Sequence, residues 1–417
     1  MSKDKKVLVV GGGGRCHAIV DAFVRSPRVE KVFCAPGNAG IAEIAECVPV
    51  SATDVEGLVA LAKKEGIDIT VVGPEAALAE GIVDRFREEG LRILGPTKVA
   101  TRIESSKEFA KEIMMKYGIP TAGYEAFSDF DKAWEYVKNR PLPAVIKYDG
   151  LAAGKGVVVA LTYDEAETAL RDMLLDHSFG QGRVVVEDFL SGPEFSFMCL
   201  VQGRKVYPLA LAQDHKRAYD GDKGPNTGGM GAYSPLPFVS DEVRDKALSE
   251  ILQRTADAMA DEGVEFTGVL YGGLILTEDG PKVIEFNARF GDPETEVVLP
   301  RLKSDFYEFV DAVLDGRDFE TEWYPEACLG IVMAAKGYPG SYEKGAEIKG
   351  TEGKTIYHMG TKRDADGRLL TAGGRVMMVV GKGKTLAEAR EQVLADIALI
   401  DCPALFHRTD IGYQAIH

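Results

Sequence analysis

The strongest structural signal in this chain is the run Lys282-Val283-Ile284-Glu285-Phe286-Asn287-Ala288-Arg289-Phe290-Gly291-Asp292-Pro293-Glu294. Its polar and apolar residues alternate with a period of two, which is typical of a β-strand covered on one face. We therefore expect Glu285, Asn287 and Arg289 to point one way, and Ile284 and Phe286 to face a core. A carboxylate and an amide oxygen are hard ligands that suit Mg²⁺, and Arg289 supplies a fixed cation. The alternation alone would also suit an edge strand with a solvated polar face.

A glycine-rich loop lies between two apolar runs, residues 144–147 and 157–160, which predict a pair of strands. In this loop, Gly154 and Gly156 would let backbone N–H groups approach an anion closely. Lys147 and Lys155 add two positive charges between which a polyphosphate could lie. The loop is not a Walker loop, because no Gly-x-x-x-x-Gly-Lys-Ser/Thr motif opens a helix here. Taken alone, it would also suit a plain turn.

A third segment, residues 183–190, predicts a buried strand that runs into Ser191-Gly192-Pro193-Glu194. The backbone from Glu187 to Leu190 could bind an adenine edge, and Glu194 could accept hydrogen bonds from ribose hydroxyls. A core strand ended by a Gly-Pro turn is the alternative. The order of these segments resembles the ATP-grasp superfamily, whose members hold ATP between two α+β lobes and activate a carboxylate as an acyl phosphate.

Longer blocks of sequence narrow this resemblance from the superfamily to one family within it. They are residues 35–40, 72–75, 149–156, 213–217, 224–235 and 287–295. In this order they resemble the phosphoribosylamine–glycine ligase family over nearly the whole chain. The resemblance implies transfer of the γ-phosphoryl group of ATP to glycine, followed by attack of the amine of 5-phospho-β-D-ribosylamine on glycyl phosphate. The products would be glycinamide ribonucleotide, ADP and phosphate, as in de novo purine biosynthesis.

The resemblance also implies roles for individual residues. Arg289, Lys147 and Lys155 would be catalytic, and Glu285 and Asn287 would hold Mg²⁺ or Mn²⁺. Asp214 and Glu294 are expected to hold the glycine ammonium, with Asp292 and Pro293 shaping that pocket. The ATP site would comprise Lys107, Lys147, Gly154, Lys155, Gly156, Glu187, Asp188, Phe189, Leu190 and Glu194. The glycine and phosphoribosylamine sites would comprise Gly11, Gly13, Gly14, Arg15, Gly37, Asn38, Glu75, Asp214, Arg289, Asp292, Pro293, Glu294, Lys362 and Arg375.

The N-terminal part predicts a parallel sheet with helices between its strands, because short apolar runs each end in a turn rich in Gly or Pro. Ligands bind beyond the carboxyl ends of such strands. The predicted strands are residues 6–10, 31–34, 69–72 and 92–94. A nicotinamide cofactor is the obvious rival ligand, but the third glycine of its fingerprint would fall at Cys16, and no acid follows residues 31–34 to grip a ribose.

Cys16 is a departure from the family, whose usual run is Gly-Gly-Arg-Glu-His where this chain has Gly13-Gly14-Arg15-Cys16-His17. The change removes one possible acceptor for ribose hydroxyls. We expect Cys16 to pack against the sheet, although a helix N-terminus can also lower the pKa of a thiol. We expect His17 to be a packed or capping residue.

The predicted fold class is mixed α/β and α+β. A Rossmann-like N-terminal domain (1–103) precedes a two-lobed ATP-grasp domain (104–326) with a lid lobe at about 121–188, and a small α/β domain (327–417) follows. We expect a helix at 241–262 and a hairpin turned at 278–280. In the last domain we expect strands at 329–335 and 375–380 and a helix at 385–400. Because residues 269–276 carry no acid, phosphates and water would supply most metal ligands.

Composition excludes several classes of protein. A net charge of −16, from 65 acids and 49 bases, disfavours nonspecific binding to nucleic acid or anionic membranes. Six scattered cysteines form no Cys-x-x-Cys pair, and no apolar run is long enough for a signal sequence or a membrane span. We expect a cytoplasmic enzyme with small-molecule substrates, monomeric or weakly dimeric. The alternatives are another ATP-grasp ligase such as an ATP-dependent carboxylase, a nicotinamide-dependent oxidoreductase, and a noncatalytic nucleotide sensor.

Overall fold

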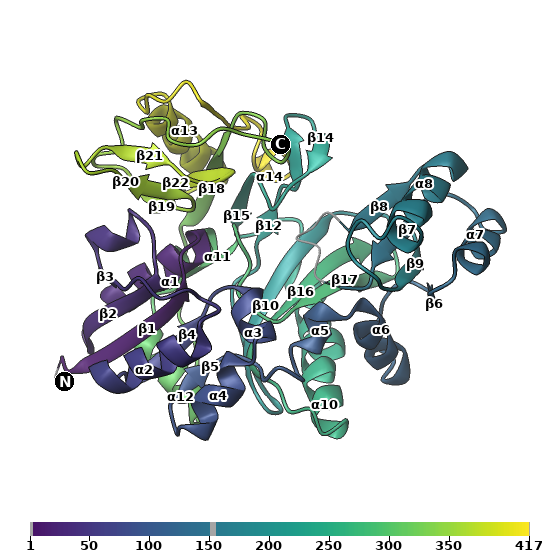
Figure 1. The fold of residues 1–417 in the computed structure, drawn as a ribbon, viewed down its shortest axis with the longest axis horizontal. Coiled ribbons are helices and arrows are strands. Elements are labelled where there is room, and N and C mark those ends of the chain that lie inside the picture. Colours follow the sequence, from purple (N-terminus) through teal and green to yellow (C-terminus); the bar gives the residue numbers. More distant parts are fainter. Residues whose placement is uncertain (1–2, 151–155, 417) are drawn as a thin grey trace.

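The structure is a computed structural model that describes residues 3–150 and 156–416. Its N-terminal unit is a parallel sheet with strand order β3-β2-β1-β4-β5, covered by helices (Figure 1). The expected parallel sheet is therefore confirmed, and its strand order reverses between β1 and β4, where ligands of such sheets bind. The strands are β1 (Lys5–Gly11), β2 (Val29–Pro36), β3 (Glu46–Cys47), β4 (Ile69–Val72) and β5 (Ile93–Leu94). The helices are α1 (Gly14–Val24), α2 (Val55–Glu65), α3 (Glu75–Ala79) and α4 (Ile82–Glu88).

The central part of the chain contains a four-stranded antiparallel sheet with the strand order β11-β10-β16-β17, and we call this part the central unit. The expected hairpin is present, because β16 (Thr267–Thr277) turns directly into β17 (Gly280–Asn287). Its other strands are β10 (Glu194–Gln202) and β11 (Lys205–Pro208). Helices α5 (Arg102–Ser105) and α6 (Lys107–Lys116) lead into this unit, and α11 (Thr295–Val298) and α12 (Phe306–Leu314) follow β17.

A β-bulge interrupts the alternation of β17. Val283 pairs with Leu274 and Glu285 pairs with Gly273, so Ile284 is an extra residue without a partner on β16. The expectation that Ile284 faces the core is therefore wrong. Val283 and Phe286 are buried in the main core instead, and the unpaired carbonyl of Ile284 is left free for another donor.

The lid lobe lies on the far side of this sheet from the N-terminal unit (Figure 1). It is an antiparallel sheet of order β6-β9-β7-β8 with two helices and its own small core, which includes Ile146, Leu170 and Val186. Its elements are β6 (Tyr124–Phe127), α7 (Phe130–Lys138), β7 (Ala144–Tyr148), β8 (Val157–Ala160), α8 (Tyr163–Leu174) and β9 (Val184–Asp188). The predicted pair of strands around the glycine loop is thus β7 and β8.

The helix expected at 241–262 is present but not uniform. Helices α9 (Asp241–Ala247) and α10 (Arg254–Asp261) are joined by a π-helical segment, Leu248–Gln253. Single-sequence periodicity does not distinguish a π-helical turn from an α-helical one, because both keep the chain helical.

The last sheet combines strands from both sides of residue 326, in the order β12-β15-β18-β22-β19. Its strands are β12 (Gln213–Asp214), β15 (Gly231–Ser234), β18 (Ala327–Ala335), β19 (Ile356–His358) and β22 (Arg375–Gly383), with β23 (Leu405–Phe406) beside β18. Helix α13 (Leu386–Ile397) packs on it, and α14 (Tyr413–Ile416) ends the described chain. Two small hairpins complete the fold, β13 (Arg217–Tyr219) with β14 (Lys223–Asn226) and β20 (Thr361–Arg363) with β21 (Leu369–Thr371). Within the described residues, no helix is long and apolar enough to cross a membrane.

Candidate active site

The first part of the site lies where β1 and β4 end side by side. Arg15, in the first turn of α1, donates from its guanidinium to the carbonyl of Gly73 at 3.1 Å. The same guanidinium lies 3.6 Å from a carboxylate oxygen of Glu75. A side chain at Gly11, where φ is +127°, would meet the Cys16 sulfur at 2.5 Å, so glycine is required there. The predicted sugar-phosphate residues Gly11, Arg15 and Glu75 therefore lie together.

Arg289 occupies the centre of the site. Its guanidinium lies 3.4 Å from Glu75 and 3.2 Å from Glu104, and it donates to the Asn287 amide oxygen at 3.2 Å. Glu104 also accepts from the backbone N–H of Ala288 at 2.7 Å. Burial raises the pKa of Glu104, and Arg289 opposes that rise. No sequence motif marks Glu104, and only the folded structure shows its contact with Arg289.

Asp292 links the N-terminal unit to the last domain. It accepts from the backbone N–H of Arg15 at 3.1 Å and lies 2.9 Å from the guanidinium of Arg375. Burial opposes its ionisation, but Arg375 and Arg15 hold the pKa of Asp292 below its usual value. Arg375 also donates to the carbonyl of Gly228 at 2.8 Å. The structure therefore brings Asp292, predicted for the glycine pocket, together with Arg15 and Arg375, predicted for the sugar phosphate.

Glu294 is held by two hydroxyl groups that the sequence analysis did not single out. Ser196 donates to its carboxylate at 2.8 Å and Tyr271 at 2.7 Å, and all three residues are buried. Asp214 interacts electrostatically with Glu294 from the neighbouring strand β12. Burial raises the pKa of Asp214 to about 7, with Glu294 adding to the rise and Lys216 opposing it. Two interacting acids suit an ammonium group, whose positive charge would favour the ionised form of Asp214.

Glu285 lies among cations. Burial would raise its pKa, but Lys216, Lys147, Lys107 and Arg289 together hold the pKa of Glu285 below its usual value. The carboxylate is therefore ionised. No group of three or more His, Cys, Asp or Glu residues that could hold a metal occurs in residues 3–150 and 156–416.

Lys147 connects the lid lobe to β17. Its ammonium donates to the carbonyl of Ile284 at 2.8 Å, which the β-bulge leaves unpaired, and lies 2.9 Å from Glu187. Lys111 reaches the other side of Glu187 at 3.1 Å. Lys111 is buried although it lies in a helix, where lysines are usually solvated, and no sequence motif marks it. Lys107 donates to the carbonyl of Gly150 at 3.0 Å.

The remaining residues predicted for the ATP site lie at two places along β9, Gly156 near its start and Asp188, Phe189 and Glu194 at or beyond its end. Gly156 is buried and its carbonyl accepts from the Tyr148 N–H at 2.8 Å, whereas Gly154 and Lys155 lie outside the described residues. Phe189 is 45% exposed. Asp188 pairs with Arg140, and Glu194 lies 3.5 Å from Lys216. The Glu194 side chain therefore reaches toward the same lysine that faces Asp214.

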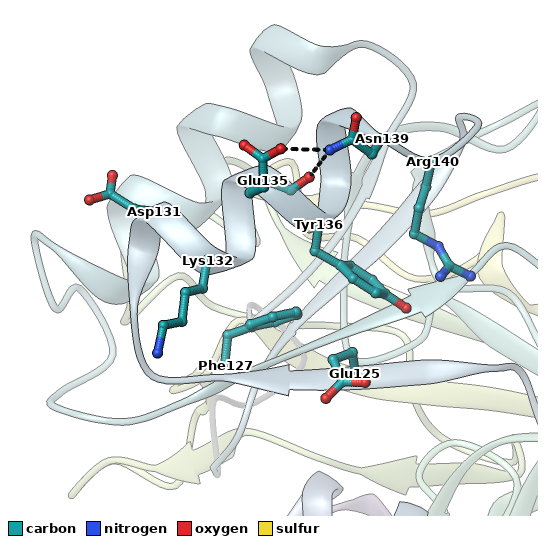
Figure 2. Close-up of a pocket in the computed structure, with 8 residues that line it drawn as sticks. All are labelled: Glu125, Phe127, Asp131, Lys132, Glu135, Tyr136, Asn139 and Arg140. Carbon is teal, nitrogen blue, oxygen red and sulfur yellow. Dashed lines mark hydrogen bonds between the residues drawn. The ribbon is translucent and has the colours of Figure 1, made fainter.

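A separate hollow of about 780 Å³ lies on the lid lobe between α7 and β6 (Figure 2). Its lining is Glu125, Phe127, Asp131, Lys132, Glu135, Tyr136, Asn139 and Arg140. None of these eight is a predicted site residue. Both signs of charge line the hollow, and it opens broadly to solvent, so it does not define a ligand.

Other predicted substrate residues have roles within the protein. The Asn38 amide donates to the carbonyls of Gly12, at 2.9 Å, and His358, at 2.7 Å. A side chain at Gly37, where φ is +74°, would meet the Cys47 sulfur at 2.3 Å. Lys362 is exposed on β20. Asn38 and Gly37 thus shape the loop after β2, while Lys362 lies at the surface of the last domain.

Cys16 and His17 behave as packed residues. Cys16 is buried against the sheet, and burial raises the pKa of its thiol to about 11, so the alternative of a lowered thiol pKa is wrong. His17 is buried and accepts from the backbone N–H of His358 at 2.9 Å. Burial, with a contribution from His358, lowers the pKa of His17 to about 3, and burial lowers that of His358 to about 4.

This histidine pair predicts acid sensitivity. Below pH 6.5 both histidines bind protons in the unfolded chain but stay neutral in the folded protein. The free energy of unfolding should therefore fall as the pH drops from 6.5 toward 4. Replacing His17 with Gln, which keeps an acceptor, should reduce that dependence by about one proton, or about 1.4 kcal/mol per pH unit. Urea unfolding at pH 4.5 to 7 measures it. Equal pH dependence in both proteins would contradict the prediction.

Comparison with known proteins agrees with this geometry. Family models described as phosphoribosylglycinamide synthetase match the chain in its N domain at residues 5–104, its ATP-grasp domain at 105–295 and its C domain at 328–414. The two-lobed site therefore places the chain in the ATP-grasp class of proteins. Within that class, it belongs to the phosphoribosylglycinamide synthetase family.

Individual relatives support the same family. The phosphoribosylamine–glycine ligase of Halalkalibacterium halodurans is 54% identical over 416 residues, covering 98% of this chain and 97% of that protein. The crystal structure of the Thermotoga maritima phosphoribosylamine–glycine ligase has a TM-score of 0.87 and 34% identity, covering 97% of this chain and 100% of that one. The biotin carboxylase domain of Hydrogenobacter thermophilus 2-oxoglutarate carboxylase has a TM-score of 0.74 at 18% identity, covering 98% and 92%, which shows a shared fold alone.

Proposed function

We propose that this protein is an ATP-dependent carbon–nitrogen ligase that joins glycine to 5-phospho-β-D-ribosylamine. The reaction gives glycinamide ribonucleotide, ADP and phosphate, a step of purine biosynthesis. The observation that carries the proposal is the convergence on Arg289: β17 brings Glu285 and Asn287 to it, and the N-terminal rim brings Glu75, which also pairs with Arg15. Family membership supplies the identity of the substrates.

The chemistry follows from the low reactivity of a carboxylate. An amine does not displace an oxygen of the glycine carboxylate until that oxygen becomes a good leaving group. A glycine oxygen attacks the γ-phosphorus of ATP and displaces ADP, which gives glycyl phosphate. The neutral amine of phosphoribosylamine then attacks the acyl carbon, phosphate leaves and the nitrogen loses a proton. No side-chain nucleophile is required, so catalysis rests on positioning and charge neutralisation.

On the nucleotide side, Lys147 neutralises phosphate charge from the lid lobe and Arg289 stabilises the developing acyl phosphate. Lys147 is held for this role by Glu187 and by the Ile284 carbonyl. Hard oxygen donors at Glu285 and Asn287, one of them an ionised carboxylate, fit Mg²⁺ or Mn²⁺, which when bound would neutralise phosphate charge there. Lys155 and Gly154 complete the predicted phosphate loop.

On the substrate side, Asp214 and Glu294 receive the glycine ammonium, while Arg15 and Arg375 offer cations to the sugar phosphate. The Asp292 carboxylate pairs with both arginines, at 3.6 Å from Arg15 and 2.9 Å from Arg375, and its single charge offsets only part of theirs. A phosphate that enters between them would replace part of this pairing. Lys362, exposed on the last domain, is proposed as a third cation for the sugar phosphate. The protein is proposed to act in the cytoplasm, as a monomer or weak homodimer, without nucleic acid or membrane partners.

An ADP-release assay with each substrate omitted in turn tests the function. ADP formation should require both glycine and phosphoribosylamine, and ribosylamine without its phosphate should be a much poorer substrate. ATP consumption that needs bicarbonate and ignores glycine would replace the ligase by the carboxylase alternative.

Replacing Arg15 with Ala should raise the KM for phosphoribosylamine by at least about tenfold, the effect of losing one charged hydrogen bond. Nucleotide binding should remain close to normal, because Arg15 lies on the N-terminal rim and the nucleotide lies under the lid lobe. Steady-state kinetics with each substrate varied, and titration with an ATP analogue, measure both. Replacement of Arg25, a half-exposed residue at the C-terminal cap of the same helix, by Ala is the matched control. An Arg15 variant with an unchanged KM would remove this residue from the sugar-phosphate site.

A further inference from the structure

Successive side chains of the segment Asp214 to Lys216 face the active site and the C-terminal end of the chain in turn. Lys216 lies 3.5 Å from Glu194, and Asp214 and Lys216 interact electrostatically with Glu294 and Glu285, so both face the active site. His215, between them, points the other way, as the period of an extended strand requires. Its backbone continues the pairing of β12 with β15, since its N–H donates to Gly231 at 2.9 Å.

The imidazole of His215 meets the C-terminal tail, which we define as residues 408–413. Its Nε2 atom accepts a hydrogen bond from the backbone N–H of Gly412 at 3.0 Å. An accepting Nε2 leaves the proton on Nδ1, which lies 3.9 Å from the Asp222 carboxylate. The ring lies between Tyr233 and Tyr413, with centroids 6.0 and 5.7 Å away. His215 is only 3% exposed, so its orientation is fixed by these contacts.

The tail also fixes the residues that follow His215. Arg408 is fully buried and donates to the Arg217 carbonyl at 3.0 Å and to Asp222 at 2.9 Å. Asp410 balances its charge and accepts from the N–H of Gly221 at 2.8 Å.

At the outer edge of the tail, Thr409 donates twice to Asp220, from its backbone N–H at 2.9 Å and from its hydroxyl at 2.6 Å. The tail therefore contacts the segment from residue 215 to residue 222. A buried arginine matched by two carboxylates is costly to form and specifies one arrangement.

We propose that His215 is a positioning residue, and that the C-terminal tail acts through it to hold Asp214 and Lys216 in the active site. This inference rests on the proposed function, because it takes Asp214 as part of the glycine site. The tail and the hairpin that contains β13 and β14 lie side by side at the same end of the molecule (Figure 1). The tail therefore supports the substrate site through His215, although the tail itself lies outside that site.

The test compares His215→Leu with His215→Gln in the full chain. Leucine cannot accept from Gly412, so the KM for glycine should rise by at least about tenfold, as expected for the loss of a buried hydrogen bond. The amide of glutamine can replace Nε2 as the acceptor, so this variant should stay within about threefold of the unmodified protein. The KM for phosphoribosylamine should change much less in either variant, because Arg15 is held by Gly73, Glu75 and Asp292.

Two further variants separate positioning from stability. Val393→Ala creates a cavity under α13, in the core of the C-terminal domain that carries the tail. It should lower the melting temperature without changing the KM for glycine. Asp220→Ala removes the two hydrogen bonds from Thr409 at the exposed edge of the tail. Because these contacts are exposed, we expect the variant to fold. It should raise the KM for glycine by about threefold with little change in melting temperature.

Two results would overturn the inference. One is a Leu variant, or an Asp220 variant if the Leu protein does not fold, whose kinetics with glycine match the unmodified protein. The other is a Val393 variant that raises the KM for glycine as much as they do. If the unmodified protein itself released ADP without needing glycine, the proposed function would fail first, so the two failures are distinguishable.

Discussion

Replacing Glu285 with Gln should lower the rate of ADP formation by at least about a hundredfold, the size of losing a key electrostatic stabiliser. Gln keeps the shape of the side chain but removes its charge. That charge is held ionised by four surrounding cations, including Lys216 and Lys147. In the variant these cations remain without the carboxylate, and one of the two proposed metal ligands loses its charge. Steady-state kinetics over a range of Mg²⁺ concentrations measure the loss.

A matched control lies on the same hairpin. Asp279→Asn makes the same chemical change in the exposed turn before β17, where the carboxylate pairs with Lys282, and should leave the rate unchanged. Circular dichroism and the melting temperature should be similar for both variants. If the Glu285 variant kept near-normal turnover at every Mg²⁺ concentration, Glu285 would be a strand residue without a role in the reaction.

Much of the fold follows from local sequence periodicity. Strand β4 occupies the four residues predicted for it, and β16 and β17 form the predicted hairpin, because alternation and turn residues report directly on local backbone geometry. The bulge at Ile284 was not predictable in this way. The bulge depends on the pairing register between β17 and β16. It leaves the carbonyl of Ile284 without a partner on β16, and this carbonyl accepts a hydrogen bond from Lys147 of the lid lobe.

The site was predictable where residue chemistry lies in one short motif. Asn287, Arg289 and Asp292 could be selected because they follow one another in the chain. Glu104 could not, since 184 residues separate it from the Ala288 N–H that it accepts from. Lys111 reads as an exposed helix residue, and only the position of Glu187 explains why its ammonium is buried.

Replacing Arg289 with Met should have the other large effect, on both activity and stability. The variant leaves Glu104 buried without its cation, whereas Glu75 keeps Arg15 as a partner. Removing one member of a buried ion pair costs about 3–5 kcal/mol. Activity should also fall by at least about a hundredfold, because the cation proposed to face the acyl phosphate is lost. Urea unfolding and ADP-release kinetics measure the two effects.

A second substitution separates these effects. In Arg289→Met/Glu104→Gln the amide can still accept from the Ala288 N–H, and no buried charge is left unpaired. Most of the lost stability should return, to within about 1 kcal/mol, while activity stays low. Recovery of activity together with stability would show that Arg289 only supports the fold.

The pH dependence of the single variant gives an independent check. Burial already raises the pKa of Glu104, and removing Arg289 should raise it further. A carboxyl group with a raised pKa binds its proton more tightly in the folded state, so its unfavourable effect grows as the pH rises above about 4.5. The stability deficit of Arg289→Met should therefore be small at pH 4.5 and increase toward pH 7. A deficit that is the same at both pH values would mean that the loss comes from packing around the missing guanidinium and not from an unpaired Glu104.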